Sequence, residues 1–203
     1  MVYIAVTGGI GCGKSHLALY LQSCFIPVCE ADELAHKALS HGTKVYADVV
    51  SEFGMAILDD SGEVNRNKLA AIVFGCETKL NRLNALVHPF VKKEIINWLK
   101  SEEEKGASAA AVIIPLLFEV GMESGWDAII AIGCSDETQN ERLMKRGLSE
   151  NQCRQRIASQ MPVKDKMDKA EFAIWNDEDK KSFENKIDDV LKMILEKKHG
   201  RRE

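Results

Sequence analysis

Short apolar runs alternate with longer amphipathic segments along the chain. The runs cover residues 2–6, 26–29, 109–117, 128–134 and 172–175, and each has the length and composition of a buried strand. The segments between them mostly carry apolar residues at helical spacing. This alternation predicts an α/β fold in which a parallel sheet is covered by helices on both faces.

One connection is far longer than a plain crossover. Residues 36–106, between the second and third runs, read mostly as helix, so we expect an inserted helical lobe. Within this lobe, residues 59–62 (DDSG) indicate a turn, and Pro89 indicates a kink or break in a helix over residues 81–100. The last helix carries one apolar stripe, made of Phe183, Ile187, Val190, Leu191, Ile194 and Leu195.

The first apolar run leads directly into residues 8–15 (GGIGCGKS), which match the pattern G-x-x-x-x-G-K-[ST]. The strand before this phosphate loop and the helix after it are the context that the motif requires. Backbone N–H groups and the positive end of the helix dipole then face a phosphate. We expect Lys14 to reach the β- and γ-phosphates and Ser15 to bind the bridging Mg²⁺. The predicted nucleotide contacts in the loop are Gly9, Ile10, Gly11, Cys12, Gly13, Lys14 and Ser15.

A carboxylate follows the second apolar run, in Glu30-Ala31-Asp32. Ligands of open parallel sheets lie beyond the carboxyl ends of the strands, so Asp32 is placed to accept a proton from an attacking hydroxyl or to hold a water on Mg²⁺. The alternative is that Asp32 caps the helix that follows it. The sequence leaves both interpretations open.

A basic segment follows the fourth run. Residues 142–169 contain eight basic and three acidic side chains, in a chain with a formal net charge of −4. Arg142 and Arg146 are four positions apart and share a helix face. Since a guanidinium donates two parallel hydrogen bonds to phosphate oxygens and stays charged without water, this pair suits a triphosphate clamp. A solvated basic face is the alternative. Asn176, just after the last run, is positioned to border an adenine.

Composition limits the partners and the location. The hydrophobic fraction of 45% and charged fraction of 29% are ordinary for a soluble chain of 203 residues, and the negative net charge argues against nucleic-acid or membrane binding. No apolar stretch is long enough to span a bilayer, and no basic leader precedes the phosphate loop. The six cysteines include no C-x-x-C pair, which fits free thiols in a reducing compartment. We expect a cytoplasmic monomer.

Cys12 lies inside the phosphate loop. Helix-end N–H groups lower the pKa of a thiol and raise its reactivity, so Cys12 is either a reactive thiol or a small residue that the loop tolerates.

Two short matches to GTPase motifs fail on context. Residues 59–62 resemble D-x-x-G, and residues 185–188 spell N-K-x-D. The first lies in the predicted turn of the lobe and the second lies in the middle of the last helix, whereas a guanine-reading motif follows a strand.

Together these segments resemble the dephospho-coenzyme A kinase family over nearly the whole chain. The resemblance rests on TGGIGCGKS at residues 7–15, EADELAH at 30–36, PLLFE at 115–119 and ERLMKR at 141–146. Further matches are Gly62, Val64, Asn65, Arg66, Leu69, Val73, Phe74, Leu83, Asn84, His88, Pro89, Arg156, Ile157, Gln160 and Asn176. The resemblance implies transfer of the γ-phosphoryl group of ATP, with Mg²⁺, to the ribose 3′-hydroxyl of dephospho-coenzyme A.

The family pattern also assigns roles along the chain. Asp32 takes the general-base position, with Lys14 and Arg142 as the other catalytic residues. A core of residues 1–35, 107–146 and 170–203 carries an acceptor lobe over 36–106 and a lid over 147–169. The implied acceptor contacts are Asp32, Arg66, His88, Leu116, Phe118 and Glu119, and the implied ATP contacts outside the loop are Arg142, Arg146 and Asn176.

Three positions depart from the family pattern. Glu30 stands where aspartate is usual, His16 replaces threonine and is expected to point away from the phosphates, and Asn176 lacks the glycine that usually follows it. Two other functions stay open: a P-loop kinase with a different small-molecule or nucleotide acceptor, and a non-catalytic nucleotide switch.

Overall fold

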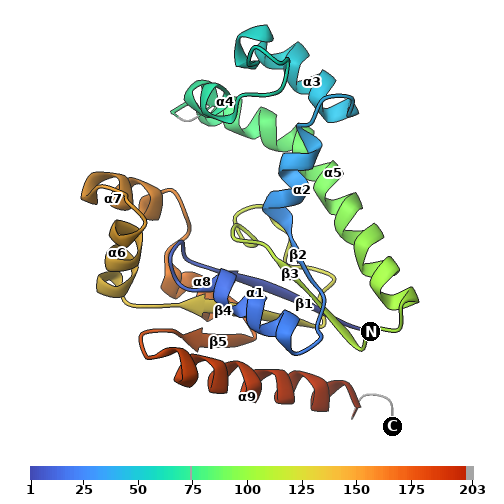
Figure 1. Cartoon of the computed structure of the whole chain (residues 1–203), viewed down its shortest axis with the longest axis vertical. Helices are drawn as coiled ribbons and strands as arrows, with labels where there is room; N and C mark the ends of the chain where they lie inside the picture. The colour runs from blue at the N-terminus through green and yellow to red at the C-terminus, as the bar shows by residue number, and fades with distance from the viewer. Residues whose placement is uncertain (74, 200–203) are drawn as a thin grey trace. The chain divides into compact units, whose positions relative to one another are not determined.

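The computed structural model describes residues 1–73 and 75–199 (Figure 1). It divides into two compact units, one made of residues 1–29 and 101–203 and the other of residues 30–100. The residues of the second unit, 30–100, largely coincide with those of the predicted lobe, 36–106.

The first unit is built on a sheet, with β1 (Val2–Gly8), β2 (Val28–Glu30), β3 (Ala109–Ile113), β4 (Ala128–Gly133) and β5 (Phe172–Trp175). The described strands form one sheet in the order β2-β3-β1-β4-β5. The pairs of β1 with β3, β1 with β4 and β4 with β5 are parallel. β3 is buried along its whole length, and β1 nearly so, as expected for central strands of a parallel sheet with both faces covered.

Helices cover both faces of this sheet. On one face, α1 (Lys14–Ser23) and α9 (Lys180–His199) pack a core in which Leu17 and Phe183 meet Ile4 and Ile132. On the other face lies α8 (Val163–Lys169). Ile132 and Cys134 point into the core beneath α1 and α9, so the position between them, Gly133, faces the opposite way. A Cβ added to Gly133 would lie 2.8 Å from a methyl group of Val163. Between β4 and α8 come α6 (Asp136–Lys145) and α7 (Glu150–Ala158). The predicted α/β fold with a covered parallel sheet is confirmed.

The second unit is helical, with α2 (Ala31–Ala38), α3 (Lys44–Phe53), the short 3₁₀ helix η1 (Met55–Ile57), α4 (Arg66–Val73) and α5 (Glu77–Glu104), whose last turn belongs to the first unit. The predicted turn at residues 59–62 is present, closed by a bridge between Leu58 and Val64. The sequence predicted a kink or a break at Pro89. Because α5 continues through this proline, the predicted break is wrong.

Candidate active site

The phosphate loop connects β1 to α1 and depends on its glycines. Gly8 and Gly13 have φ angles of +142° and +113°, which favour glycine. A Cβ on Gly8 would lie 2.2 Å from the carbonyl oxygen of Ile132, and one on Gly13 would lie 2.2 Å from Nδ2 of Asn176. At Gly8 the backbone of β4 therefore leaves no room for a side chain, and a side chain at Gly13 would require Asn176 to move.

Two polar side chains, Lys14 and Ser15, follow the last glycine of the loop. Lys14 Nζ donates hydrogen bonds to the carbonyl oxygens of Gly8 at 2.9 Å and Gly9 at 2.8 Å, so the ammonium group lies beside the loop backbone. Ser15 lines the adjoining pocket. The phosphate contact expected of Lys14 and the Mg²⁺ contact expected of Ser15 stay predictions.

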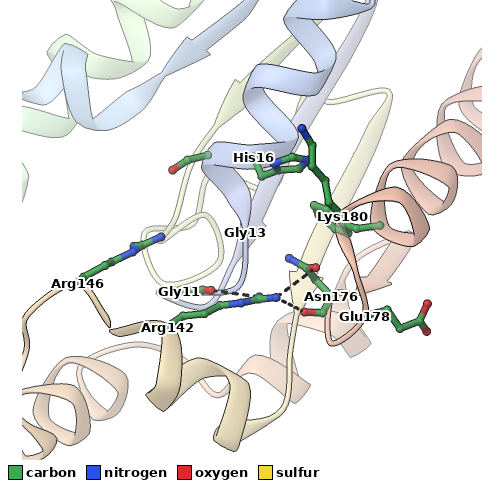
Figure 2. Close-up of a pocket in the computed structure, with 10 residues that line it drawn as sticks. Gly11, Gly13, His16, Arg142, Arg146, Asn176, Glu178 and Lys180 are labelled. Atoms are coloured by element: carbon green, nitrogen blue, oxygen red, sulfur yellow. Dashed lines mark hydrogen bonds between the residues drawn. The ribbon is translucent and has the colours of Figure 1, made fainter. Parts of the chain in front are cut away.

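Arg142 and Asn176 join the loop from two other segments of the first unit. The guanidinium of Arg142, on α6, donates to the backbone oxygen of Asn176 at 2.9 Å and also lies 3.5 Å from the carbonyl oxygen of Gly11. The buried amide of Asn176 donates to the carbonyl oxygen of Cys12 at 2.8 Å. Figure 2 shows the hydrogen bonds of Arg142 to Gly11 and Asn176. The structure thus brings together three segments that the sequence analysis had singled out separately.

A pocket of about 310 Å³ opens beside this network (Figure 2). Basic side chains predominate among its charged residues. It is lined by Gly11, Gly13, Ser15, His16, Arg142, Arg146, Asn176, Glu178, Lys180 and Phe183. Such a lining combines cations for phosphates with ring surface for a base.

His16 lies in this pocket, a position that the sequence analysis did not give it. Its Nε2 is 3.0 Å from a carboxylate oxygen of Glu184, and its ring centroid is 5.7 Å from that of Phe183. Phe183 and Glu184 lie near the start of α9, about 170 positions away in the sequence, so no local pattern indicates the contact.

Two glutamines hold the peptide groups of Ile10 in the loop. The side-chain oxygen of Gln160, between α7 and α8, accepts the Ile10 N–H at 3.0 Å, and the amide of Gln139 donates to the Ile10 oxygen at 2.7 Å. Gln139 is buried, and its own Oε1 has no hydrogen-bond partner among the described residues. Gln160 belongs to the segment predicted as the lid, and Gln139 carried no sequence signal.

The predicted acceptor residue Glu119 has partners within the first unit. Its carboxylate lies 2.7 Å from Nζ of Lys166 on α8 and accepts the backbone N–H of Met161 at 2.9 Å. Lys166 is fully buried and also donates to the carbonyl oxygen of Pro115 at 2.6 Å. This ion pair fixes α8 to the turn that follows β3. The acceptor contacts implied for Glu119, and for its neighbours Leu116 and Phe118, stay predictions.

The other predicted acceptor residues lie in the second unit. Asp32 is the second residue of α2 and is exposed. The N-cap position of α2 is Glu30, without a side-chain capping bond, so the interpretation of Asp32 as the helix cap is wrong. Arg66, the first residue of α4, is hydrogen-bonded to the ring of His36. On α5, burial and the charge of Lys92 lower the pKa of His88.

Among residues 1–73 and 75–199, no group of three or more His, Cys, Asp or Glu side chains is arranged to hold a metal ion. Mg²⁺ bound through one hydroxyl and the substrate phosphates needs no such group, which keeps Ser15 a suitable ligand. Within the same residues, no helix has the length and apolar character needed to cross a membrane.

Comparison with known proteins gives one consistent match. The family model described as "Dephospho-CoA kinase" matches residues 2–182. The chain is 37% identical over 199 residues to a dephospho-CoA kinase of Bdellovibrio bacteriovorus, covering 98% of this chain and 99% of the relative. A solved structure, TT1252 from Thermus thermophilus, superposes with a TM-score of 0.83 at 31% identity, over 95% of this chain and 97% of that one. The dephospho-CoA kinase of Campylobacter jejuni gives a TM-score of 0.62 at 27% identity, over 95% and 96%.

Proposed function

The chain belongs to the dephospho-CoA kinase family, and on that premise we propose that it transfers the γ-phosphoryl group of ATP to the ribose 3′-hydroxyl of dephospho-coenzyme A. The product is coenzyme A, and the reaction is the last step of its synthesis. The observation that carries the proposal is the network joining Arg142 and Asn176 to the phosphate loop beside a cationic pocket.

The donor half of the reaction follows from the first unit. We assign the triphosphate to the loop from Gly9 to Ser15 and the adenosine to the pocket that Arg146 and Asn176 line. Lys14 and Arg142 bring positive charge to the phosphoryl oxygens, where negative charge is distributed in the transition state. Mg²⁺ on Ser15 supplies further charge neutralisation at the β- and γ-phosphates when it is bound.

The acceptor half is assigned to the remaining residues of the family pattern. Asp32 accepts the proton of the 3′-hydroxyl. The hydroxyl oxygen forms a bond to the γ-phosphorus, and the bond between that phosphorus and the bridging oxygen of ADP breaks. The acceptor binds through Arg66, His88, Leu116, Phe118 and Glu119. Residues 147–169 act as a lid that excludes water, which is a competing acceptor. Because α8 is packed against the sheet and Lys166 is buried, we place the moving part of this lid in α7.

We further propose that the enzyme acts in the cytoplasm as a monomer with no nucleic-acid or membrane partner. The six free cysteines and the net charge of −4 support this assignment.

The test is ADP release from ATP and Mg²⁺ with and without dephospho-coenzyme A, with the product identified by mass. Coenzyme A formation is expected. Turnover only with other hydroxyl or nucleotide acceptors would identify a different P-loop kinase, and nucleotide retention without acceptor-dependent turnover would identify a switch.

The role of Asp32 is tested by Asp32→Asn, with Glu33→Gln on the same helix as the matched control. Loss of a general base lowers kcat by about 10²- to 10⁴-fold and leaves ATP affinity nearly unchanged. Equal activity of the two variants would remove Asp32 from the chemistry.

A further inference from the structure

Two cysteine side chains meet beneath the phosphate loop. The thiol of Cys134, the first residue after β4, donates a hydrogen bond to Sγ of Cys12 over 3.1 Å. The two residues are 122 positions apart in the sequence and are both buried in the core of the first unit. Cys134 carried no sequence signal, and Cys12 was singled out only for its place in the loop.

The side chain of Cys12 does not face the nucleotide pocket. The flanking Gly11 and Gly13 are among the residues that line that pocket and Cys12 is not, whereas the side chain of Cys12 packs in the core cluster with Cys134. The proposed phosphate binding therefore uses the backbone of Cys12 and leaves both thiols without a role in the phosphoryl transfer.

We propose that Cys12 and Cys134 form an oxidation site, at which a peroxide converts the two thiols to a disulfide that disables the phosphate loop. Sulfur of Cys12 attacks a peroxide oxygen, the O–O bond breaks, and a sulfenic acid and one water form. Sulfur of Cys134 then attacks sulfur of Cys12, the S–O bond breaks, and a second water leaves. Overall the two thiols lose two protons and two electrons, and hydrogen peroxide is reduced to two water molecules.

The electrostatic surroundings favour Cys12 as the attacking sulfur. The hydrogen bond from Cys134 is the largest influence and lowers the pKa of the Cys12 thiol, burial raises it, and the charges of Lys14 and Arg142 lower it. The same hydrogen bond, reinforced by burial, raises the pKa of the Cys134 thiol. A thiol with a lowered pKa is the more readily oxidised of a pair.

The disulfide affects binding because the loop has no room to adjust. A disulfide bond of about 2.05 Å draws the two sulfurs roughly 1 Å closer than they lie here. On one side of Cys12, a Cβ on Gly9 would lie 2.5 Å from a methyl group of Val163. On the other, the backbone oxygen of Cys12 is held by a hydrogen bond from the amide of Asn176 at 2.8 Å. We infer that the loop backbone takes up part of this movement, which displaces the N–H groups assigned to the phosphates, and misplacement by about 1 Å costs as much as 10²-fold in rate.

The full-length protein is treated with hydrogen peroxide, its remaining thiols are alkylated under denaturing conditions, and the peptides are analysed by mass spectrometry. We expect a linked peptide pair containing Cys12 and Cys134, two hydrogens lighter than the sum of its parts. Turnover should fall by about 10- to 100-fold in proportion to the linked fraction, and dithiothreitol should restore it.

The linkage does not depend on the proposed acceptor, but its effect on turnover rests on the proposed kinase function. The affinity for ATP and Mg²⁺, measured by calorimetry on reduced and oxidised protein, separates the two, since it needs no acceptor. A weakened affinity for ATP in the oxidised protein supports the proposed oxidation site even if dephospho-coenzyme A is not the substrate.

Two variants complete the test. Cys134→Ala should give no linked peptide and leave the oxidation of Cys12 at the sulfenic acid, and Cys24→Ser, which removes an exposed thiol, should keep both the linkage and the dithiothreitol-reversible inactivation. Recovery of alkylated Cys12 and Cys134 from peroxide-treated wild-type protein would overturn the proposal. So would a linked protein with unchanged ATP affinity and turnover.

Discussion

The ion pair between Glu119 and Lys166 gives Glu119 a structural role that can be tested against the substrate-binding role implied by the family pattern. We consider Glu119→Gln, which removes the negative charge and keeps the size of the side chain. In the wild-type structure the carboxylate is 20% exposed and the lysine side chain 0%, at a distance of 2.7 Å. After the substitution the ammonium group of Lys166 stays buried, with the carbonyl oxygen of Pro115 as its remaining strong acceptor. That oxygen is already shared with the Thr7 hydroxyl at 3.2 Å.

The expected cost follows from this geometry. Breaking a buried ion pair on one side costs about 3–5 kcal/mol, because a buried charge is left without its partner. Since the amide oxygen of glutamine still accepts one hydrogen bond, we expect about 3 kcal/mol for Glu119→Gln. Lys166→Met should cost about 1 kcal/mol, because the carboxylate it leaves behind reaches water. The double variant should cost about the same as Lys166→Met alone, which gives a coupling of about 3 kcal/mol.

Urea unfolding followed by tryptophan fluorescence measures these differences, with Glu123→Gln as an exposed control on the same segment. The melting temperature should fall by about 6–12 °C in Glu119→Gln, given about 2–4 °C per kcal/mol for a chain of this size. A loss below about 1 kcal/mol, or a larger loss in Lys166→Met, would refute the structural reasoning. An unchanged stability with a raised KM for dephospho-coenzyme A would instead support the substrate contact that the family pattern implies.

Three further outcomes are expected. Gly8→Ala should destabilise the protein by about 3–5 kcal/mol, measured by thermal unfolding, because its Cβ would lie 2.2 Å from a backbone oxygen of β4. Gln160→Ala removes the acceptor of the Ile10 N–H. It should raise the KM for ATP about 5-fold, which corresponds to the net loss of one hydrogen bond of about 1 kcal/mol, and leave the melting temperature nearly unchanged. An unaltered KM would contradict a positioning role. Burial raises the pKa of Asp177, but hydrogen bonds from the start of α6 outweigh it and hold the pKa below the ordinary value of 3.8. The stabilisation of the folded protein by the Asp177 carboxylate is therefore fully present above pH 3.8 and is lost as the pH falls through the lowered pKa. Asp177→Asn should therefore flatten the decline of the melting temperature below about pH 4.

The local elements of this protein could be predicted from the sequence. The phosphate loop, the strand before it and the helix after it follow from eight consecutive residues and the apolar run at residues 2–6. The stripe of Phe183 and Ile187 gives α9 in the same way. Such features depend on side-chain period and backbone preference, which are properties of a short stretch of chain. Even so, the sequence left open whether Asp32 caps a helix, and only the structure shows that α2 starts at Ala31 with Asp32 inside it, because helix boundaries depend on capping geometry.

Contacts between distant segments were decided by the tertiary structure. The sulfur pair of Cys12 and Cys134 exists because β1 and β4 are neighbours in the sheet, and the contact of His16 with Glu184 exists because α1 and α9 cover the same face. Glu119 was placed among the acceptor contacts by its motif, yet the packing of α8 gives it Lys166 as a partner. The chain order contains no record of which residues meet across a sheet or between two helices. Strand register and helix packing set those distances, and only the folded molecule fixes both.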